Sequence, residues 1–191
     1  MAKKSTRQLW TDALNGGSLK KQKSTDYQCS RGCSGIILGI DPSLRGTGIA
    51  ILESYEKRFK FIFSKRLSLE PRFSFYRCLG EIFGEIDEIV VKYQPSYAAV
   101  ERTIFVQNYK IAQTLGSVRG AVLAALARRE IEVCEYPPLR IKQAITGVGR
   151  ASKEQVMGTV KNILNIEHEI SSDESDALAA ACCHAWTFVP E

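Results

Sequence analysis

The sequence predicts an α/β domain in which helices flank a mixed sheet of five strands. Short, nearly continuous apolar runs at 36–40 and 97–100 are typical of buried strands, and each is followed at once by a carboxylate. In 59–63, phenylalanines alternate with Lys60 and Ile62, which also predicts a strand. Segments between the strands carry apolar residues three and four positions apart, as amphipathic helices do. The predicted order of three strands, helix, strand, helix, strand and helices requires a mixed sheet.

The stretch around Asp41 organises the rest of the chain. A buried strand ends at Asp41, and a turn containing Pro42, Gly46 and Gly48 leads into a second apolar strand, 47–52. A carboxylate at the end of an apolar strand costs stability unless a cation lies beside it. On this stretch alone, Asp41 is either a turn-capping aspartate or a metal ligand.

The third strand is followed by a helix, 75–93, and a fourth strand, 97–101. Three strands with short connections predict an antiparallel meander. Because a helical crossover joins parallel strands, the fourth strand is expected to run parallel to the first. It delivers Glu101 at its carboxyl end, as the first strand delivers Asp41. Ligands collect at the carboxyl ends of parallel strands, so we expect the two acids to face one crevice.

The second half of the chain predicts a further strand and four helices. The pairs Ser152 with Gln155 and Ser171 with Glu174 have the spacing of capping boxes, which mark helix starts. The predicted elements are a helix at 111–128, a strand at 131–136, a short helix at 139–145, a glycine-containing loop at 146–150, a helix from the Ser152 cap to Leu164, and a last helix at 173–188.

Charge divides the 191 residues into a basic extension, 1–34, and a domain, 35–191. The extension holds seven cations and two acids, 7 − 2 = +5, which is the whole net charge of the chain. Its polar composition predicts disorder. A basic extension on a neutral domain fits a polyanion partner, nucleic acid before membrane. An extension without a role and an organellar transit peptide have the same composition, so all three interpretations stay open.

Neither a membrane segment nor a cysteine framework is predicted. No apolar run approaches the roughly 18 residues that span a bilayer, and no secretory signal opens the chain. We therefore expect a protein that acts inside a cell without a membrane partner. Cys29 and Cys33 lie close together but no second ligand pair follows, which argues against a zinc site. The other four cysteines lie in apolar stretches and are expected to be buried thiols.

Asp173 and Asp176 form a second acidic pair at the start of the last helix. Three residues apart, they share one helix face, and the apolar run 177–181 indicates that this face borders the core. With Asp41 and Glu101 they make four carboxylates that would repel one another by on the order of several kcal/mol at interior dielectric. Divalent cations relieve such repulsion, and oxygen donors without His or Cys favour Mg²⁺ or Mn²⁺ over Zn²⁺.

Five motifs resemble the RuvC family of bacterial Holliday-junction resolvases, in order and spacing, over residues 35–186. They are Ile-Asp-Pro-x-x-x-x-Thr-Gly at 40–48, Val-Glu at 100–101, Leu-Gly-x-x-Arg-Gly at 115–120, Lys-Gln-x-x-x-Gly-x-Gly at 142–149 and Asp-x-x-Asp-Ala-Leu at 173–178. The resemblance implies a ribonuclease H-like fold, a homodimer, and paired nicking of four-way DNA junctions with two Mg²⁺ ions, Mn²⁺ being an alternative. It also implies 5′-phosphate and 3′-hydroxyl ends.

The same resemblance implies a cellular setting and partners. Members of the family act in recombination and repair, so we expect four-way junction DNA and a branch-migration helicase complex as partners. The expected location is the bacterial cytoplasm, on DNA. If the extension 1–34 is a transit peptide, the location would instead be an organelle.

The resemblance also implies roles for individual residues. The metal-binding and catalytic acids of the family match Asp41, Glu101, Asp173 and Asp176, and Lys142 matches a catalytic lysine. The implied DNA-binding residues are Phe105, Asn108, Arg119, Lys142 and Lys153. Two positions depart from the family pattern: Ser43 stands where glycine is usual, and Ile104 where phenylalanine is usual, the aromatic being Phe105. The first changes the turn after Asp41, and the second changes which side chain is expected to stack on bases.

Three other hypotheses fit parts of the sequence. The turn after Asp41 also resembles the phosphate-binding hairpin of actin-like ATPases, but those enzymes need two such domains and this chain has the length of one. A closer alternative is a YqgF-type ribonuclease H-like nuclease acting on RNA; the Arg-Gly pair at 119–120 and the lysine-containing loop favour RuvC. The third is a non-catalytic junction-binding protein of the same fold, which would not need all four acids.

Overall fold

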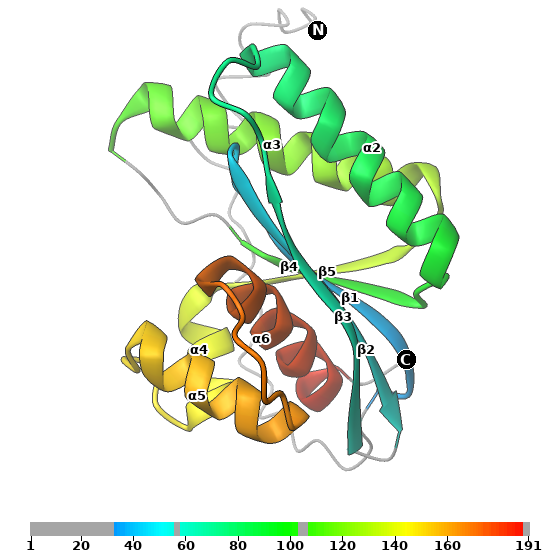
Figure 1. Ribbon diagram of the computed structural model, residues 1–191, viewed down its shortest axis with the longest axis vertical. Helices are drawn as coiled ribbons and strands as arrows, with labels where there is room; N and C mark the ends of the chain where they lie inside the picture. The colour runs from blue at the N-terminus through cyan, green and yellow to red at the C-terminus, as the bar shows by residue number, and fades with distance from the viewer. Residues whose placement is uncertain (1–32, 56–57, 103–106, 189–191) are drawn as a thin grey trace, which may run out of the picture.

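The computed structural model describes residues 33–55, 58–102 and 107–188, which form one five-stranded sheet with helices on both faces (Figure 1). The strands are β1 (Gly35–Asp41), β2 (Gly46–Tyr55), β3 (Arg58–Ser68), β4 (Tyr97–Glu101) and β5 (Glu132–Tyr136). The helices are α2 (Phe75–Tyr93), α3 (Tyr109–Arg128), α4 (Pro138–Thr146), α5 (Lys153–Leu164) and α6 (Ser172–Thr187). The predicted α/β class with a mixed five-stranded sheet is confirmed.

The strand order across the sheet is β3-β2-β1-β4-β5. β1 pairs antiparallel with β2, and β2 pairs antiparallel with β3, so the predicted meander is confirmed. β4 lies parallel to β1 on its other side, and β5 lies parallel to β4, as helical crossovers require. The carboxyl ends of β1 and β4 are therefore neighbours.

Two apolar cores lie between the sheet and its helices. α2 and α3 cover one face of the sheet, and α4, α5 and α6 cover the other (Figure 1). Residues of β1 alternate between the two cores: Ile37 faces the α6 side, whereas Leu38 and Ile40 face the α2 side. Because β1 is buried on both faces, its sequence is nearly continuously apolar.

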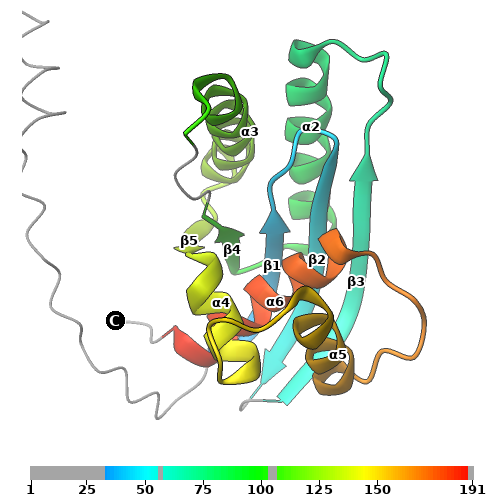
Figure 2. The ribbon, with the colours of Figure 1, turned by 90° about the vertical axis from the view of Figure 1, so that its left-hand side faces the viewer.

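Helix α6 crosses directly over β1 and β2 (Figure 2), where two glycines leave room for its backbone. A Cβ atom at Gly39 would overlap the carbonyl oxygen of Ala177, and a Cβ atom at Gly48 would overlap the carbonyl oxygen of Asp173. Any side chain at either position would push the helix away from the sheet. This contact places the first turns of α6 beside the carboxyl end of β1.

The helix caps agree with the sequence prediction. The side chains of Ser152 and Ser171 accept hydrogen bonds from the backbone N–H groups of Gln155 and Glu174, whose side chains bond back to the two serine N–H groups. Both predicted capping boxes are therefore present. The bounds of α2, α5 and β4 equal the predicted ranges. α3, α4, α6 and β5 differ from theirs by one or two residues at one or both ends, and β2 is longer than the predicted strand 47–52.

β3 is longer than the predicted strand 59–63 and contains a bulge. Phe61 and Phe63 pair with consecutive residues of β2, which leaves Ile62 without a partner. Phe61 packs against the core on the α6 side, whereas Phe63 stacks on Tyr93 of α2. The simple alternation expected for this strand is therefore interrupted, and the residues after Ile62 change faces.

Some predictions fall outside the described residues. The structure does not describe residues 1–32 and 103–106, so the expectations for most of the basic extension and for Phe105 stay predictions. No helix in the described ranges is long and apolar enough to cross a membrane. The four cysteines expected to be buried are Cys78, Cys182 and Cys183, which are fully buried, and Cys134, which is partly buried.

Replacing Gly39 by alanine is expected to destabilise the protein, because a methyl group there would overlap the backbone of α6. Overpacking a core typically costs 1–3 kcal/mol, and we expect about 3 kcal/mol here because backbone cannot rotate away. Equilibrium unfolding in urea measures the change. Gly158→Ala in α5 is the matched control: nothing lies within 4 Å of a Cβ there, so it should stabilise the helix by about 0.5–1 kcal/mol. Equal stability of the two variants would contradict the close approach.

Candidate active site

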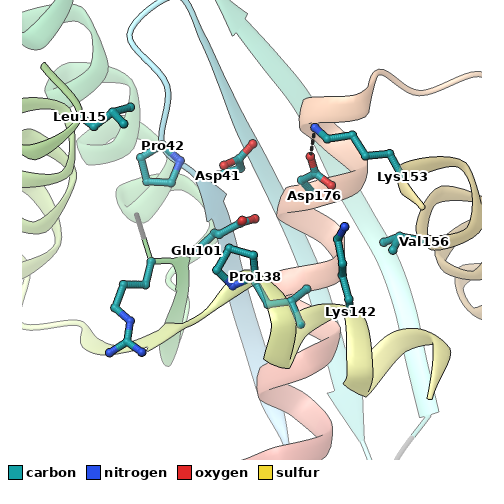
Figure 3. A pocket seen from close by; sticks show the side chains of 11 residues that line it. Asp41, Pro42, Glu101, Leu115, Pro138, Lys142, Lys153, Val156 and Asp176 are labelled. Atoms are coloured by element: carbon teal, nitrogen blue, oxygen red, sulfur yellow. Dashed lines mark hydrogen bonds and ion pairs between the residues drawn. The ribbon is translucent and has the colours of Figure 1, made fainter. Parts of the chain in front are cut away.

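Asp41 and Glu101 lie side by side at the carboxyl ends of β1 and β4 (Figure 3). The parallel register pairs Ile40 with Val100, so the acids that follow them are neighbours. Both side chains line one pocket of about 350 Å³. The two acids therefore face one crevice, as the parallel arrangement of their strands predicts.

The pocket lies between the end of the sheet and helices α3, α4, α5 and α6. Its acids come from the sheet and from α6, and its two lysines come from α4 and from the start of α5 (Figure 3). Three carboxylates and three cationic side chains therefore share one space. The lining residues are Asp41, Pro42, Glu101, Arg102, Leu115, Pro138, Ile141, Lys142, Lys153, Val156 and Asp176.

The capping box at Ser171 starts α6 so that Asp173 and Asp176 fall in its first two turns. Asp176 enters the pocket, where Nζ of Lys153 donates a hydrogen bond to its Oδ2 at 3.0 Å. Asp173 pairs instead with Arg66 of β3 and does not line the pocket. The two acids thus occupy the same end of α6, but each has its own cationic partner.

Lys142 enters the pocket from α4. Its Nζ donates a hydrogen bond to the carbonyl oxygen of Ala151 at 2.9 Å. Ala151 immediately precedes Ser152, the N-cap of α5. The lysine therefore ties α4 to the start of α5, and it holds its ammonium group in the same pocket as Glu101.

The two strand acids have strongly raised pKa values. Burial raises the pKa of Asp41 to about 7; the charges of Asp176 and Asp173 add to the rise, and Lys153 opposes it. Burial likewise raises the pKa of Glu101 to about 8, with the charges of the neighbouring carboxylates adding to it. Near neutral pH both acids therefore hold protons to a large extent, and a bound cation would displace these protons.

The donors in the pocket fit a hard divalent cation. They are carboxylate oxygens, and no His or Cys among the described residues lines the pocket. In the described part of the chain, no three such side chains already converge as a metal site requires. A cation would therefore have to draw Asp41, Glu101 and Asp176 together. Burial and the charges of the neighbouring carboxylates raise the pKa values of the two strand acids, and the positive charge of a bound cation would oppose both effects.

Two other predicted DNA-contact residues, Arg119 and Asn108, do not line the pocket. The guanidinium group of Arg119 donates two hydrogen bonds to the carboxylate of Glu135, at 2.6 and 2.5 Å, and so joins α3 to β5. Asn108 is the N-cap of α3, and its side chain accepts hydrogen bonds from two backbone N–H groups of the first turn. Phe105 lies outside the described residues. The sequence analysis predicted neither the ion pair of Arg119 with Glu135 nor the capping role of Asn108.

The turn after Asp41 does not need the glycine that is usual in the family at the position of Ser43. The hydroxyl group of Thr47 donates to the carbonyl oxygen of Ser43 at 2.6 Å, which closes the turn. Ser43 is not among the described residues with a positive φ. A serine therefore fits this backbone without strain.

Sequence reasoning missed two cations near the acids. Arg102 lines the pocket, and its place directly after Glu101 was a signal that could have identified it. Arg66 pairs with Asp173, which lies 107 residues further along the chain. No spacing in the sequence indicates that contact, because it depends on how β3 pairs and bulges.

Comparisons with known proteins identify the family. A family model described as Crossover junction endodeoxyribonuclease RuvC matches residues 37–184. The chain belongs to the RuvC family. A crossover junction endodeoxyribonuclease RuvC from Acinetobacter baylyi is 43% identical over 150 residues, which cover 78% of this chain and 82% of the relative. One from Desulforamulus reducens is 40% identical over 151 residues, covering 78% and 93%.

Solved structures agree with this family assignment. Thermus thermophilus RuvC in complex with a Holliday junction substrate matches with a TM-score of 0.75 and 28% identity, covering 80% of this chain and 93% of that one. The yeast mitochondrial Holliday junction resolvase Ydc2 matches with a TM-score of 0.55 and 14% identity, covering 86% and 83%, and this likeness concerns the fold alone. The predicted ribonuclease H-like fold and RuvC resemblance are confirmed. RuvC-family members are metal-dependent nucleases, so the pocket acids are the candidate ligands.

Replacing Asp41 by asparagine is expected to stabilise the protein in a chelator. The pKa of Asp41 is raised from 3.8 to about 7, so its charged form, present above pH 7, is unfavourable in the folded state. We expect a gain on the order of 1–3 kcal/mol at pH 8. The gain should shrink as the pH falls from 7 toward 4, because the wild-type carboxyl then becomes neutral. Thermal unfolding in EDTA at pH 8 and pH 5 measures it.

Asp87→Asn is the control for this measurement. Asp87 forms an ion pair with Arg129, which lowers its pKa, so its substitution should not stabilise the protein at pH 8. If the Asp41 variant is less stable than the wild-type protein at pH 8 in EDTA, the charged form of Asp41 does not destabilise the folded state, and its pKa is not raised as described.

Proposed function

We propose that this chain is a structure-selective endonuclease that resolves four-way DNA junctions by paired nicks in homologous recombination and repair. One observation carries the proposal: a chain matched by the RuvC family model over residues 37–184 gathers three carboxylates and two lysines in one pocket. A relative with 28% identity has been solved with a Holliday junction substrate, which supports the choice of DNA substrate.

In the proposed site, Asp41, Glu101, Asp173 and Asp176 hold two Mg²⁺ ions, with Mn²⁺ as a substitute. Ions bound there would lower the pKa of the attacking water and stabilise the leaving 3′-oxygen; the water oxygen would bond to phosphorus as the bond to the 3′-oxygen breaks, giving 5′-phosphate and 3′-hydroxyl ends. Asp41 and Glu101 release their protons when they become ligands, because only the carboxylate form binds a cation. Their raised pKa values make this release easiest above neutral pH.

The two lysines are proposed to act on the scissile phosphate. Lys153 is 64% exposed and bonds Asp176, so its ammonium group can move to a phosphate oxygen when Asp176 becomes a ligand. Lys142 is held by the carbonyl oxygen of Ala151. An ammonium group in a fixed position stabilises charge that develops on the phosphoryl oxygens without paying for reorganisation.

We propose that the protein works as a homodimer, because a four-way junction has two symmetry-related strands to cut and a two-fold dimer offers two matching sites. Helix α3 is a candidate interface or wedge, with exposed Tyr109 and Ile111 in its first turn. The proposed DNA contacts are Asn108, which is the N-cap of this helix, Arg119, and Phe105, which lies outside the described residues. For Arg119 this requires a rearrangement of its pair with Glu135.

Residues 35–191 form the proposed nuclease domain, and the basic extension 1–34 is proposed to add phosphate contacts that do not depend on base sequence. A branch-migration helicase complex stays a predicted partner. The bacterial cytoplasm stays the predicted location.

Purified protein should be assayed with a four-way junction, a linear duplex and an RNA–DNA hybrid, each with Mg²⁺ and with Ca²⁺. We expect paired nicks in the four-way junction and in neither of the other two substrates. We expect them with Mg²⁺ and not with Ca²⁺, because Ca²⁺ favours irregular coordination by more ligands at longer distances. Cutting of the hybrid in place of the junction would favour a YqgF-type nuclease. Junction binding without cutting in Mg²⁺ or Mn²⁺ would favour a non-catalytic junction-binding protein.

The Asp41→Asn and Glu101→Gln variants should lose cutting by at least about 10³-fold, because each removes a charged metal ligand. Junction affinity should stay equal or improve, since less negative charge faces the phosphates. Gel-shift titration and single-turnover cutting measure the two effects separately. Glu81→Gln, which removes a surface carboxylate paired with Arg77 on α2, is the matched control and should cut normally. Near-normal cutting by either site variant would exclude that acid as a ligand.

Lys142→Ala should slow cutting by about 10²-fold and change junction affinity by less than about threefold. The reason is that a positioned cation stabilises the transition state more than the ground state. Single-turnover rates at saturating protein give the first number, and binding in Ca²⁺ gives the second. The control is Lys161→Ala, in the last turn of α5: it removes a lysine that is paired with Glu169 outside the pocket and should change neither the rate nor the affinity. A larger effect on affinity than on rate would make Lys142 a binding residue.

A further inference from the structure

Asp173 lies over a row of residues that crosses three strands. The pairing register places Asp41 of β1 opposite Gly48 of β2, and Gly48 opposite Arg66 of β3. Directly paired residues project to the same face of a sheet. Because Gly48 has no side chain, the backbone of Asp173 fits over it. Asp173 is therefore placed between Arg66 on one side and Asp41 on the other.

Arg66 is held in a defined orientation below the start of α6. Its Nε donates to Oδ2 of Asp173, and its Nη1 donates to the hydroxyl oxygen of Ser68 at 3.2 Å. The guanidinium plane covers Gly46, where a Cβ atom would lie 2.6–3.0 Å from three guanidinium atoms. A side chain at Gly46 would displace the arginine. Two glycines of β2 thus make room for the ion pair, one for each partner.

The bulge in β3 is what turns Arg66 toward α6. Phe61 packs against the core on the α6 side, and regular alternation from it would send Lys65 to that side and Arg66 to the other. Because Ile62 is an extra residue in the strand, the order is reversed. Lys65 pairs with Glu85 of α2, and Arg66 pairs with Asp173 of α6.

We propose that Arg66 is a positioning residue for Asp173, resting on the proposed metal-dependent cutting. It fixes Oδ2 of the carboxylate, and no hydrogen bond from the described residues occupies Oδ1, which can bind a cation. It pairs with Asp173 from the β3 side of the site, as Lys153 pairs with Asp176 from the α5 side. Carboxylates that hold a metal are commonly themselves hydrogen-bonded, and loss of such a bond typically weakens metal binding by 10–100-fold.

The chemistry of the side chain matters to this role. A guanidinium group donates from a rigid plane, whereas an ammonium group is a point charge on a flexible stem. Lysine at position 66 would keep the charge but lose the fixed direction of the Nε donor. Alanine has no donor at all, so the hydrogen bond that holds Oδ2 of Asp173 would be lost. The proposal therefore orders the three proteins, with the wild type binding metal most tightly, then Arg66→Lys, then Arg66→Ala.

The experiment measures Mn²⁺ binding to the full chain without DNA in two ways. The electron paramagnetic resonance signal of free Mn²⁺ falls as the ion binds, and bound Mn²⁺ raises the Tm of the protein. We expect Arg66→Ala to weaken Mn²⁺ binding about tenfold or more, and Arg66→Lys to fall between it and wild type. In cutting assays the half-saturating metal concentration should rise by a similar factor, and the rate at saturating metal should largely recover. Arg72→Ala is the matched control, because it removes an arginine whose Nε pairs at 2.5 Å with Glu70, a residue outside the site.

Asp173→Asn supplies the test of coupling. If Arg66 acts through Asp173, adding Arg66→Ala to the Asp173→Asn variant should leave Mn²⁺ affinity unchanged. Additive losses would mean that Arg66 acts on the site by another route and would overturn the proposal. Because Arg66→Lys keeps the charge next to Asp173, its Mn²⁺ affinity tests the proposal if the alanine variant folds poorly.

Three outcomes would overturn the assignment while leaving the proposed function intact. Unchanged metal affinity in Arg66→Ala would make the ion pair a surface contact. Tighter binding would make Arg66 a competitor of the metal. Lower junction affinity in Ca²⁺ with unchanged Mn²⁺ binding would make Arg66 a phosphate contact. Failure of the wild-type protein to bind Mn²⁺ or to cut a junction would instead overturn the proposed function.

Discussion

The close approach of α6 to the sheet is the constraint on which the site depends. Two of the four proposed ligands belong to strands and two to a helix, so they can act on one site only if the helix backbone lies directly on the strands. Gly39 and Gly48 allow that distance, because a Cβ at either would overlap a carbonyl oxygen of α6. Side chains at these two positions would hold the helix further from the strands and carry Asp176 away from Asp41. The glycines of the strands are therefore as necessary to the site as its acids.

Electrostatics divides the four acids into two kinds. The helix acids Asp173 and Asp176 each have a cation within hydrogen-bonding distance, supplied by β3 and by α5. The strand acids have no such partner among the described residues, and burial raises their pKa values to about 7 and 8. The two carboxylates without a cationic hydrogen-bonding partner among the described residues, Asp41 and Glu101, are thus both on the sheet side of the pocket. A divalent cation bound there would be stabilised most by the two residues that the chain itself leaves uncompensated.

Local sequence signals predicted most of the fold and the strand acids, because those signals act over a few residues. An apolar run that ends in Asp41 or Glu101 reports a buried strand and its carboxyl end, and the spacing of Ser171 and Glu174 reports a helix start. The pairs Arg66 with Asp173 and Arg119 with Glu135 were not predicted. They depend on strand register and on helix placement across the sheet, which no short window of sequence contains.

The bulge in β3 connects an edge strand to the chemistry of the site. After Ile62, the side chains of Ser64 and Arg66 face α6, and they bond two consecutive residues of its first turn. Ser64 donates to Oε1 of Glu174 at 2.9 Å, and Arg66 donates to Asp173. Glu174 also closes the capping box that starts the helix. The edge strand thus holds the start of α6 at both residues, and without the extra residue in β3 neither contact could form.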